Sequence, residues 1–200
     1  MEKESILNQI IAKNQMQDWT SLNLLAITDQ LFNNLNEREK DVIMKRFGLY
    51  GQKRETLEGI GRQHNLTRER IRQIESGGIK KIKKHSELDE IVSKLRQAIT
   101  QLLEGHGGMM AQDHLFTTLK QLSKSDVESN LFNNYLHFLT AKVMPDDIVR
   151  VNNSNYFNSI FKLKYQSLDH LENAAQELLA VIKNKKQLLT TSELIKILKS

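Results

Sequence analysis

Apolar residues recur at helical spacing through most of the chain, and helix-capping residues separate the resulting segments. In the first 85 residues this pattern predicts five helices, at about residues 2–14, 21–34, 37–47, 57–64 and 68–84. Asn36, Thr56 and Thr67 are the expected N-caps of the last three helices. Gly48 suits the end of the third helix, and a short turn at Asn65-Leu66 joins the fourth to the fifth.

The pattern changes after residue 86, where short β-rich runs appear between the helices. Three helices are predicted, at about residues 91–103, 112–122 and 125–139, with a very short strand at Met109-Met110. The last helix is expected to open with a capping box formed by Ser125 to Glu128. Two β-rich runs, at residues 148–151 and 156–163, flank an Asn-rich turn and predict a hairpin. The order helix, strand, helix, helix, hairpin is typical of a winged-helix unit.

The C-terminal segment repeats the beginning of this unit. The apolar pairs at residues 102–103, 109–110 and 115–116 recur at a constant offset of 79. The second copy stops at Ser200, before a third helix and a hairpin, so an apolar face is expected to remain uncovered on residues 168–200. We therefore expect a partial second winged-helix unit, which belongs to a longer protein or is covered by a partner, and self-association through this segment.

Positive charge is concentrated in the segment that holds the fourth and fifth helices. Residues 36–85 contain 14 Lys and Arg against 7 Asp and Glu, whereas the rest of the chain contains 15 against 17. Charge alone favours a polyanionic partner and a solvated helix face equally. The helix pair favours DNA, because a second helix with an Arg-rich first turn after a tight turn is typical of a helix-turn-helix. The apolar residues placed to clamp the two helices together are Ile60, Leu66, Ile71 and Ile74.

Composition argues against several other classes of protein. The chain has no cysteine, and therefore no disulfide, thiolate zinc site or cysteine nucleophile. No apolar run approaches the roughly 20 residues needed to cross a bilayer, and the first residues lack the basic-then-apolar order of a signal peptide. The six histidines show no metal-ligand spacing with carboxylates, and no Ser/His/Asp arrangement stands out. We expect a cytoplasmic protein that is not an enzyme, with no metal, no cofactor and no membrane partner.

At the basic helix pair the sequence resembles a known family. The run from Thr67 to Glu75, in register with Arg46-Phe47-Gly48 and Thr56-Leu57-Glu58, is similar to region four of the sigma-70 family of bacterial RNA polymerase sigma factors. The resemblance covers residues 35–85. It implies a helix-turn-helix that recognises the −35 element of double-stranded promoter DNA and docks on the flap of the RNA polymerase β subunit.

The resemblance also implies roles for individual residues. Arg68, Glu69 and Gln73 would face bases, and their chemistry agrees, because Arg prefers guanine, Glu accepts from cytosine and Gln pairs with adenine. For Glu69 the alternative to base recognition is a contact within the helix, either an ion pair with Arg72 or a hydrogen bond with Gln73. The remaining predicted DNA-binding residues, as contacts to phosphates or to partner proteins, are Thr56, Leu57, Arg62, Thr67, Arg70, Arg72 and Lys80.

The sequence departs from the family pattern at two places. Gly59 stands where the family usually has a second acid, which weakens the N-terminal box of the bracing helix. Gly77-Gly78 lies inside the recognition helix, where each glycine costs about 1 kcal/mol relative to alanine. We expect the helix to bend or stop there, which would displace Lys80 from DNA. The sequence also lacks a recognisable region two, the part of the family that binds core polymerase.

The predicted fold is mainly α and has four parts. They are an N-terminal helical segment (1–34), a sigma region 4-like helix-turn-helix (35–86), a winged-helix unit with a small β-hairpin (87–167) and the start of a second winged-helix unit (168–200). The predicted function is sequence-specific promoter binding in transcription initiation. Two alternatives stay open, namely a regulator that uses the helix-turn-helix without sigma activity and the DNA-binding fragment of a larger DNA-processing enzyme.

Overall fold

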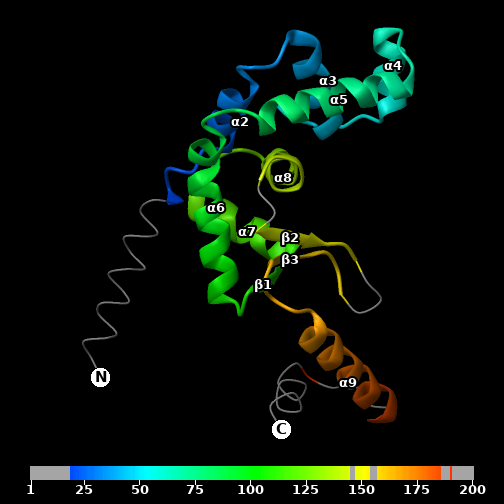
Figure 1. The fold of residues 1–200 in the computed structure, drawn as a ribbon. Helices are drawn as coiled ribbons and strands as arrows, with labels where there is room; N and C mark the ends of the chain where they lie inside the picture. The colour runs from blue at the N-terminus through cyan, green and yellow to red at the C-terminus, as the bar shows by residue number, and fades with distance from the viewer. Residues whose placement is uncertain (1–18, 145–146, 154–156, 186–189, 191–200) are drawn as a thin grey trace, which may run out of the picture.

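Helices make up most of the fold, and a small antiparallel sheet lies among them (Figure 1). The computed structural model describes residues 19–144, 147–153, 157–185 and 190, so the helix predicted at residues 2–14 lies outside the described part of the chain. The basic half contains α2 (Leu24–Phe32), α3 (Glu37–Phe47), α4 (Leu57–His64) and α5 (Arg68–Lys83). The following elements are α6 (Leu88–Gly105), β1 (Met109–Ala111), α7 (Gln112–Ser123), α8 (Ser129–Phe138), the π-helix η1 (Leu139–Val143), β2 (Ile148–Val151), β3 (Ile160–Leu163) and α9 (Asp169–Lys185). The prediction of a mainly helical protein is confirmed.

The N-caps predicted for α3, α4 and α5 are confirmed, because each side chain binds the backbone of the first helical turn. Before α3, the Asn36 side chain accepts the backbone N–H of Glu39 at 2.9 Å, and Glu39 accepts the backbone N–H of Asn36 at 3.0 Å. Thr56 and Thr67 each accept one backbone N–H, at 3.0 and 3.2 Å. Gly48 ends α3 in the left-handed conformation, with φ at 65°.

The recognition helix α5 continues through Gly77 and Gly78, so it does not stop there. A Cβ atom on Gly78 would lie 2.8 Å from Cδ1 of Ile43 in α3, which is closer than real Cβ atoms approach. Gly78 therefore allows α3 and α5 to pack closely, and this packing compensates for the low helix propensity of glycine. A Cβ atom on Gly77 would meet nothing within 4 Å.

The elements after α5 confirm the predicted order of helix, strand, helix, helix and hairpin. β2 and β3 form the antiparallel hairpin, and β1 pairs with the other edge of β3, which gives the strand order β1-β3-β2. β3 is shorter than predicted and begins at Ile160. The reason lies at Ser159, whose backbone N–H and hydroxyl both donate to the side chain of Asn153, at 2.8 and 2.6 Å.

The capping box predicted before α8 is wrong. The helix begins at Ser129 rather than within the segment from Ser125 to Glu128, and its N-cap residue makes no side-chain hydrogen bond to the helix. Ser125 instead accepts the N–H of Val127, two residues on, at 3.3 Å. A serine that forms this local turn has used its acceptor before the helix starts.

One hydrophobic core extends from α2 to β3, across the boundaries predicted at residues 34 and 86. Phe138 of α8 packs against Phe32 of α2 and Phe47 of α3, with ring centroids 5.9 and 5.2 Å apart. Asn134, also in α8, donates to the backbone carbonyl of Gly48 at 2.9 Å. These contacts fix the basic helices to the C-terminal helices through α3.

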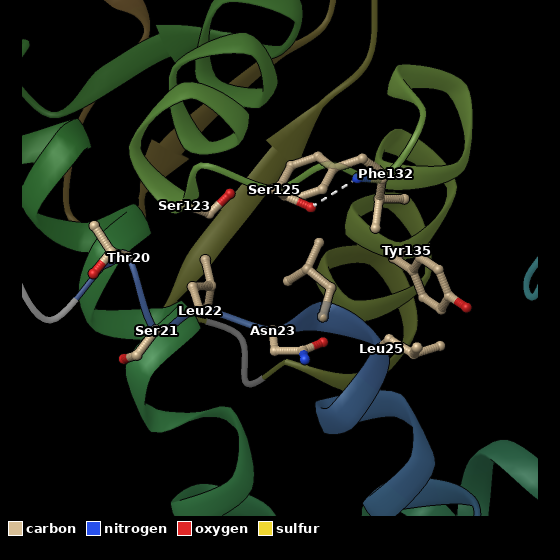
Figure 2. A pocket seen from close by; sticks show the side chains of 11 residues that line it. Thr20, Ser21, Leu22, Asn23, Leu25, Ser123, Ser125, Phe132 and Tyr135 are labelled. Carbon is tan, nitrogen blue, oxygen red and sulfur yellow. Dashed lines mark hydrogen bonds between the residues drawn. The ribbon is translucent and has the colours of Figure 1, made fainter.

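A hollow of about 410 Å³ lies where the start of α2 meets the connection between α7 and α8 (Figure 2). Most of its lining consists of apolar and hydroxyl side chains, among them Leu22, Phe132 and Ser125. Tyr135 is the one titratable group among the described residues that line it, and its hydroxyl accepts the backbone N–H of Tyr50 at 3.1 Å. This lining offers no acid–base pair of the kind that general acid–base catalysis uses.

The C-terminal helix α9 extends away from the sheet (Figure 1). Leu179 and Ile182 on this helix are 39% and 43% exposed. Ile182 belongs to the second copy of the repeat, and the later apolar pairs of that copy, Leu188-Leu189 and Leu194-Ile195, lie outside the described residues. Self-association through residues 168–200 therefore stays a prediction.

Candidate DNA-binding surface

The turn between α4 and α5 depends on a glycine. Asn65 ends α4 in the left-handed conformation, and the backbone N–H of Leu66 donates to the carbonyl of Gly61 at 2.9 Å. A Cβ atom on Gly61 would lie 2.7 Å from the carbonyl oxygen of Leu66, so a larger residue requires the backbone to move. The next residue, Thr67, caps α5. A tight turn that leads directly into a capped second helix is the geometry of a helix-turn-helix.

A small separate core braces these two helices on α3. Its fully buried members are Val42 of α3, Ile60 of α4 and Ile71 of α5. Leu57, Leu66 and Ile74 pack around them, half-buried. The clamp predicted from the sequence is confirmed, and it leaves the opposite side of α5 facing solvent.

That solvent-facing side carries the predicted base-contacting residues. Arg68, Glu69 and Gln73 are all exposed. Arg68 forms no hydrogen bond or ion pair with any described residue, so its guanidinium is available to a ligand. Arg72 donates to both carboxylate oxygens of Glu69, at 2.7 and 2.8 Å. Gln73 accepts from Arg70 at 3.1 Å and donates to Oε1 of Glu69 at 3.5 Å. The intrahelical pair considered as the alternative for Glu69 is therefore present.

The pair has the expected effect on both charges. Hydrogen bonds from Arg72 outweigh a small desolvation effect and lower the pKa of Glu69, and the same contact raises the pKa of Arg72. Glu69 is therefore ionised at neutral pH and is an acceptor only. A carboxylate has about four lone-pair sites, so an acceptor position remains after the hydrogen bonds from Arg72 and Gln73.

The side chains predicted to contact phosphates differ in whether they already form ion pairs within the protein. Arg62 pairs with Glu58 one turn earlier in α4, with 2.6 Å between Nη2 and the carboxylate. Lys80 is exposed and forms no ion pair with a described residue. Lys81 pairs with Glu39 of α3 at 2.8 Å, so it braces the helices. Thr56 and Leu57 lie at the N-terminus of α4, where unpaired backbone N–H groups attract anions.

A polar contact that the sequence did not reveal also holds α4 in place. His64, in the last turn of α4, lies 2.7 Å from a carboxylate oxygen of Asp41 in α3, and Lys45 lies 2.9 Å from the same oxygen. Burial of Asp41 favours its neutral form, but the hydrogen bonds from Lys45 and His64 outweigh that effect and lower its pKa. Asp41 and His64 are 23 positions apart in the sequence, so their contact is seen only in the tertiary structure.

No three His, Cys, Asp or Glu side chains in the described part of the chain come together as a group that could hold a metal ion. No helix in the same ranges is long and apolar enough to span a bilayer.

An exposed, arginine-rich helix that a second helix braces through a tight turn defines a helix-turn-helix DNA-binding domain. Comparison with known families agrees, because residues 31–84 match the family described as Sigma-70, region 4. These residues are a sigma-70 region 4 domain, as the resemblance indicated.

Relatives among curated proteins match part of the chain. The RNA polymerase sigma factor RpoD of Helicobacter pylori is 52% identical over 61 residues, which are 30% of this chain and 9% of the relative. The RNA polymerase sigma factor SigA of Lactococcus lactis is 40% identical over 86 residues, or 41% of this chain and 24% of the relative. SigA of a Nostoc species is 39% identical over 85 residues and is covered to 22%. This chain thus spans less than a quarter of each of these relatives. No solved structure matches the chain significantly.

Proposed function

We propose that the chain is a promoter-binding protein of transcription initiation, in which α5 recognises a −35-like DNA element. One observation carries the proposal, namely a sigma-70 region 4 domain that exposes the first turns of its recognition helix. Such a domain implies promoter DNA and RNA polymerase as partners, and the β flap is the part of the polymerase that we expect it to contact. In a bacterial cell a protein with this function acts in the cytoplasm.

For base recognition we propose Arg68, Glu69 and Gln73. Arg68 forms no hydrogen bond or ion pair with a described residue and is suited to a guanine edge. Glu69 is able to accept from cytosine while it retains its pair with Arg72, because its carboxylate has acceptor positions to spare. Gln73 lies one turn beyond Glu69 on the same face. When DNA is bound, its side-chain oxygen gives up the hydrogen bond from Arg70 and the amide forms hydrogen bonds with a base.

For the DNA backbone we propose a larger set around this face. Its members are Thr56, Leu57, Arg62, Thr67, Arg70, Arg72 and Lys80. The continuity of α5 through its glycine pair supports Lys80, because the residue is on the same rigid helix as Arg68. Contacts of this kind set the orientation of the protein on DNA and carry no sequence preference.

We propose that the elements from α6 to β3 form a winged-helix unit. It follows the helix-turn-helix of residues 35–86 and precedes a second unit that begins near residue 168. The order of the helices and the three-stranded sheet support this assignment. Residues 86–200 contain 13 basic and 13 acidic residues, and this balance favours protein contacts for most of their surface.

Two other functions retain support from the limited coverage of the relatives. A regulator would use region 4 at a promoter or on the polymerase without replacing a sigma factor. A DNA-processing enzyme would use it to bind DNA for a catalytic domain outside these residues. Co-purification with core RNA polymerase favours either transcription role over the enzyme, and promoter-dependent transcription by the reconstituted polymerase separates a sigma factor from a regulator.

The test of base recognition is a binding titration on a promoter-like duplex. If about five phosphates are neutralised, log K falls with log[salt] at a slope of about −4 to −5. Gln73→Ala or Glu69→Ala removes preference at one base pair, worth about 1–3 kcal/mol of discrimination, whereas the control Lys80→Ala weakens all duplexes alike. A slope near zero refutes DNA binding, and an equal loss on every duplex for Gln73→Ala refutes its assignment to a base.

A further inference from the structure

A second concentration of positive charge lies outside the predicted DNA-binding residues, in a hollow between the helix-turn-helix and the C-terminal elements. The hollow has a volume of about 290 Å³ and is formed by α3, the loop before α4, α5, α8, η1 and β2. Its lining residues are Arg46, Phe47, Arg54, Glu75, His137, Ala141, Lys142 and Arg150. We refer to it as the basic hollow. Four of these side chains are cations and one is an acid.

None of the four cations of the basic hollow forms an ion pair with a described carboxylate, although Glu75 lines the same space. The guanidinium of Arg46 donates to the backbone carbonyl of Glu55 at 3.1 Å. Arg150 donates to three neutral side chains, which are Gln112, Asn152 and Ser159. Neither Arg54 nor Lys142 forms an ion pair with a described residue, and the ammonium of Lys142 lies over the ring of Phe47, 5.9 Å from its centroid.

Several arginine and lysine side chains elsewhere in the basic segment do have acidic partners. Arg72 pairs with Glu69, and Lys81 pairs with Glu39. Four cations around one partly enclosed space repel one another, although Glu75 offsets part of this charge and solvent screens the exposed Arg54 and Arg150. An anion that enters the hollow relieves this repulsion and receives charge-assisted hydrogen bonds.

The environment of His137 reflects the same cluster of cations. This half-buried side chain lines the hollow, and burial, followed by the charges of Arg150 and Arg54, lowers its pKa against the weaker opposing effect of Asp113. The imidazole is therefore neutral at pH 7. A neutral imidazole is able to donate one hydrogen bond to an anion without adding a further charge to the unoccupied hollow.

The position of the hollow on α5 indicates which anion reaches it. Glu75 is the residue of α5 that lines the hollow, and it follows Arg68 by seven residues. The two side chains therefore lie on nearly the same side of the helix, about 10 Å apart along its axis. A helix of about 10–12 Å diameter fills the roughly 12 Å wide major groove, so the two phosphate backbones pass along its flanks. η1, which carries Lys142, packs against α5, and Lys142 and Glu75 line the same hollow.

We propose that the basic hollow binds backbone phosphates of the DNA that α5 engages, so that Lys142 and Arg150 extend the DNA interface from region 4 into the C-terminal elements. The inference rests on the proposed function, since it requires α5 to lie in the major groove. Arg54 contributes from the loop before α4, and Arg150 is held in place by its three neutral acceptors. The remainder of residues 86–200 is left for protein contacts.

The experiment compares the salt dependence of DNA binding for the full chain and for variants of the hollow. Arg54→Gln and Lys142→Gln remove one cation each without touching the predicted base contacts, and Lys142→Arg keeps the charge. The matched control is Lys94→Gln, because Lys94 is exposed on α6 and forms no ion pair with a described residue. Circular dichroism checks that each variant is folded.

If each cation neutralises one phosphate, each Gln variant lowers the magnitude of the salt slope by about 0.9, and the double variant lowers it by about 1.8. Affinity falls equally on specific and unrelated duplexes, because a phosphate contact carries no sequence preference. Lys142→Arg and Lys94→Gln leave the slope unchanged. The nuclear magnetic resonance titration of His137 shifts to higher pH when duplex is bound, since a phosphate stabilises the imidazolium.

Three outcomes overturn the inference. In the first, the wild-type chain binds its preferred duplex with a steep salt slope and the double variant does the same, in which case the proposed function stands and the hollow has no part in it. In the second, inorganic phosphate shifts the His137 titration but duplex does not, which makes the hollow a site for a free anion. In the third, the variants lose binding to core polymerase and keep the wild-type slope on DNA, which assigns the hollow to an acidic protein surface. A wild-type chain without salt-dependent binding refutes the proposed function itself.

Discussion

The two adjacent glycines of α5 provide a stability test of the packing between α3 and α5. Gly77 and Gly78 are neighbours in the interior of a continuous helix, so each has the same intrinsic cost, about 1 kcal/mol relative to alanine. They differ in what a Cβ atom would meet. At Gly77 it would meet nothing within 4 Å, whereas at Gly78 it would lie 2.8 Å from Cδ1 of the fully buried Ile43.

The expected changes in the free energy of unfolding follow from these two terms. Gly77→Ala gains helix propensity alone, so it stabilises the protein by about 0.5–1 kcal/mol. Gly78→Ala gains the same amount and loses about 1–3 kcal/mol to overpacking, so it leaves the protein unchanged or destabilises it by up to about 2 kcal/mol. For a protein of this size, 1 kcal/mol corresponds to a change in Tm of about 2–4 °C.

The cause of the difference is tested by removing the atom that clashes. Ile43→Val deletes Cδ1 and by itself costs about 0.5–1.5 kcal/mol. In that background the next atoms near a Cβ on Gly78 are Cβ of Glu39 at 3.6 Å and Cδ2 of Leu35 at 3.7 Å, which are ordinary contacts. We therefore expect Gly78→Ala to become stabilising when Ile43 is valine.

Urea and thermal denaturation followed by circular dichroism measure all four proteins. The reasoning is refuted if Gly77→Ala and Gly78→Ala change stability equally, or if Ile43→Val and Gly78→Ala have additive effects. Additivity would mean that the two residues do not interact.

Three further predictions concern the turn, the α3–α4 contact and the C-terminal segment. Gly61→Ala forces a Cβ atom against the carbonyl of Leu66, so we expect a loss of about 1–3 kcal/mol in denaturation and a loss of DNA binding in a titration, and unchanged binding would contradict this. Asp41 has a lowered pKa in the folded protein, so its stabilising effect is present above its ordinary value of 3.8 and disappears as the pH falls through the folded value. Asp41→Asn should therefore be less stable than the wild type at pH 7 and equally stable near pH 2, and a constant difference across this range would refute the role of the ionised contact with His64. Deletion of residues 168–200 removes the exposed Leu179 and Ile182. Light scattering should then show fewer copies of the chain per particle, or less aggregation, while DNA binding is retained.

Local chemistry made most of the helix ends in the basic half predictable from the sequence. An N-cap acts on the two or three residues that follow it, so Asn36, Thr56 and Thr67 could be recognised without knowledge of the fold. The prediction failed at Ser125, where the same residue type bonded two residues ahead and formed a turn rather than a cap. Both arrangements use one side-chain oxygen and one nearby N–H, and the sequence does not distinguish them.

The outcome at Gly77-Gly78 shows a different limit. Helix propensity correctly describes each glycine as a weak point, but the decisive neighbour of Gly78 is Ile43, 35 residues earlier in the chain. Tertiary packing outweighs an intrinsic preference of about 1 kcal/mol when a bulkier side chain would prevent two helices from approaching. The fact that α5 stays intact is therefore a property of the α3–α5 pair and could not be derived from α5 alone.

The basic hollow could not be predicted for the same reason, because residues far apart in the sequence form it and the overall charge of the C-terminal half does not reveal it. Residues 86–200 are electrically balanced, so the sequence favoured protein contacts for this half of the chain. The fold places Lys142 of η1 and Arg150 of β2 next to Arg46 and Arg54, almost 100 residues earlier, while most acidic residues of that half lie elsewhere. A balanced segment can therefore contribute cations to a basic hollow at one place, because the field that an anion meets is set by the charges within about 10 Å of it. The net charge of a segment limits its average interaction with DNA and does not determine where contacts form.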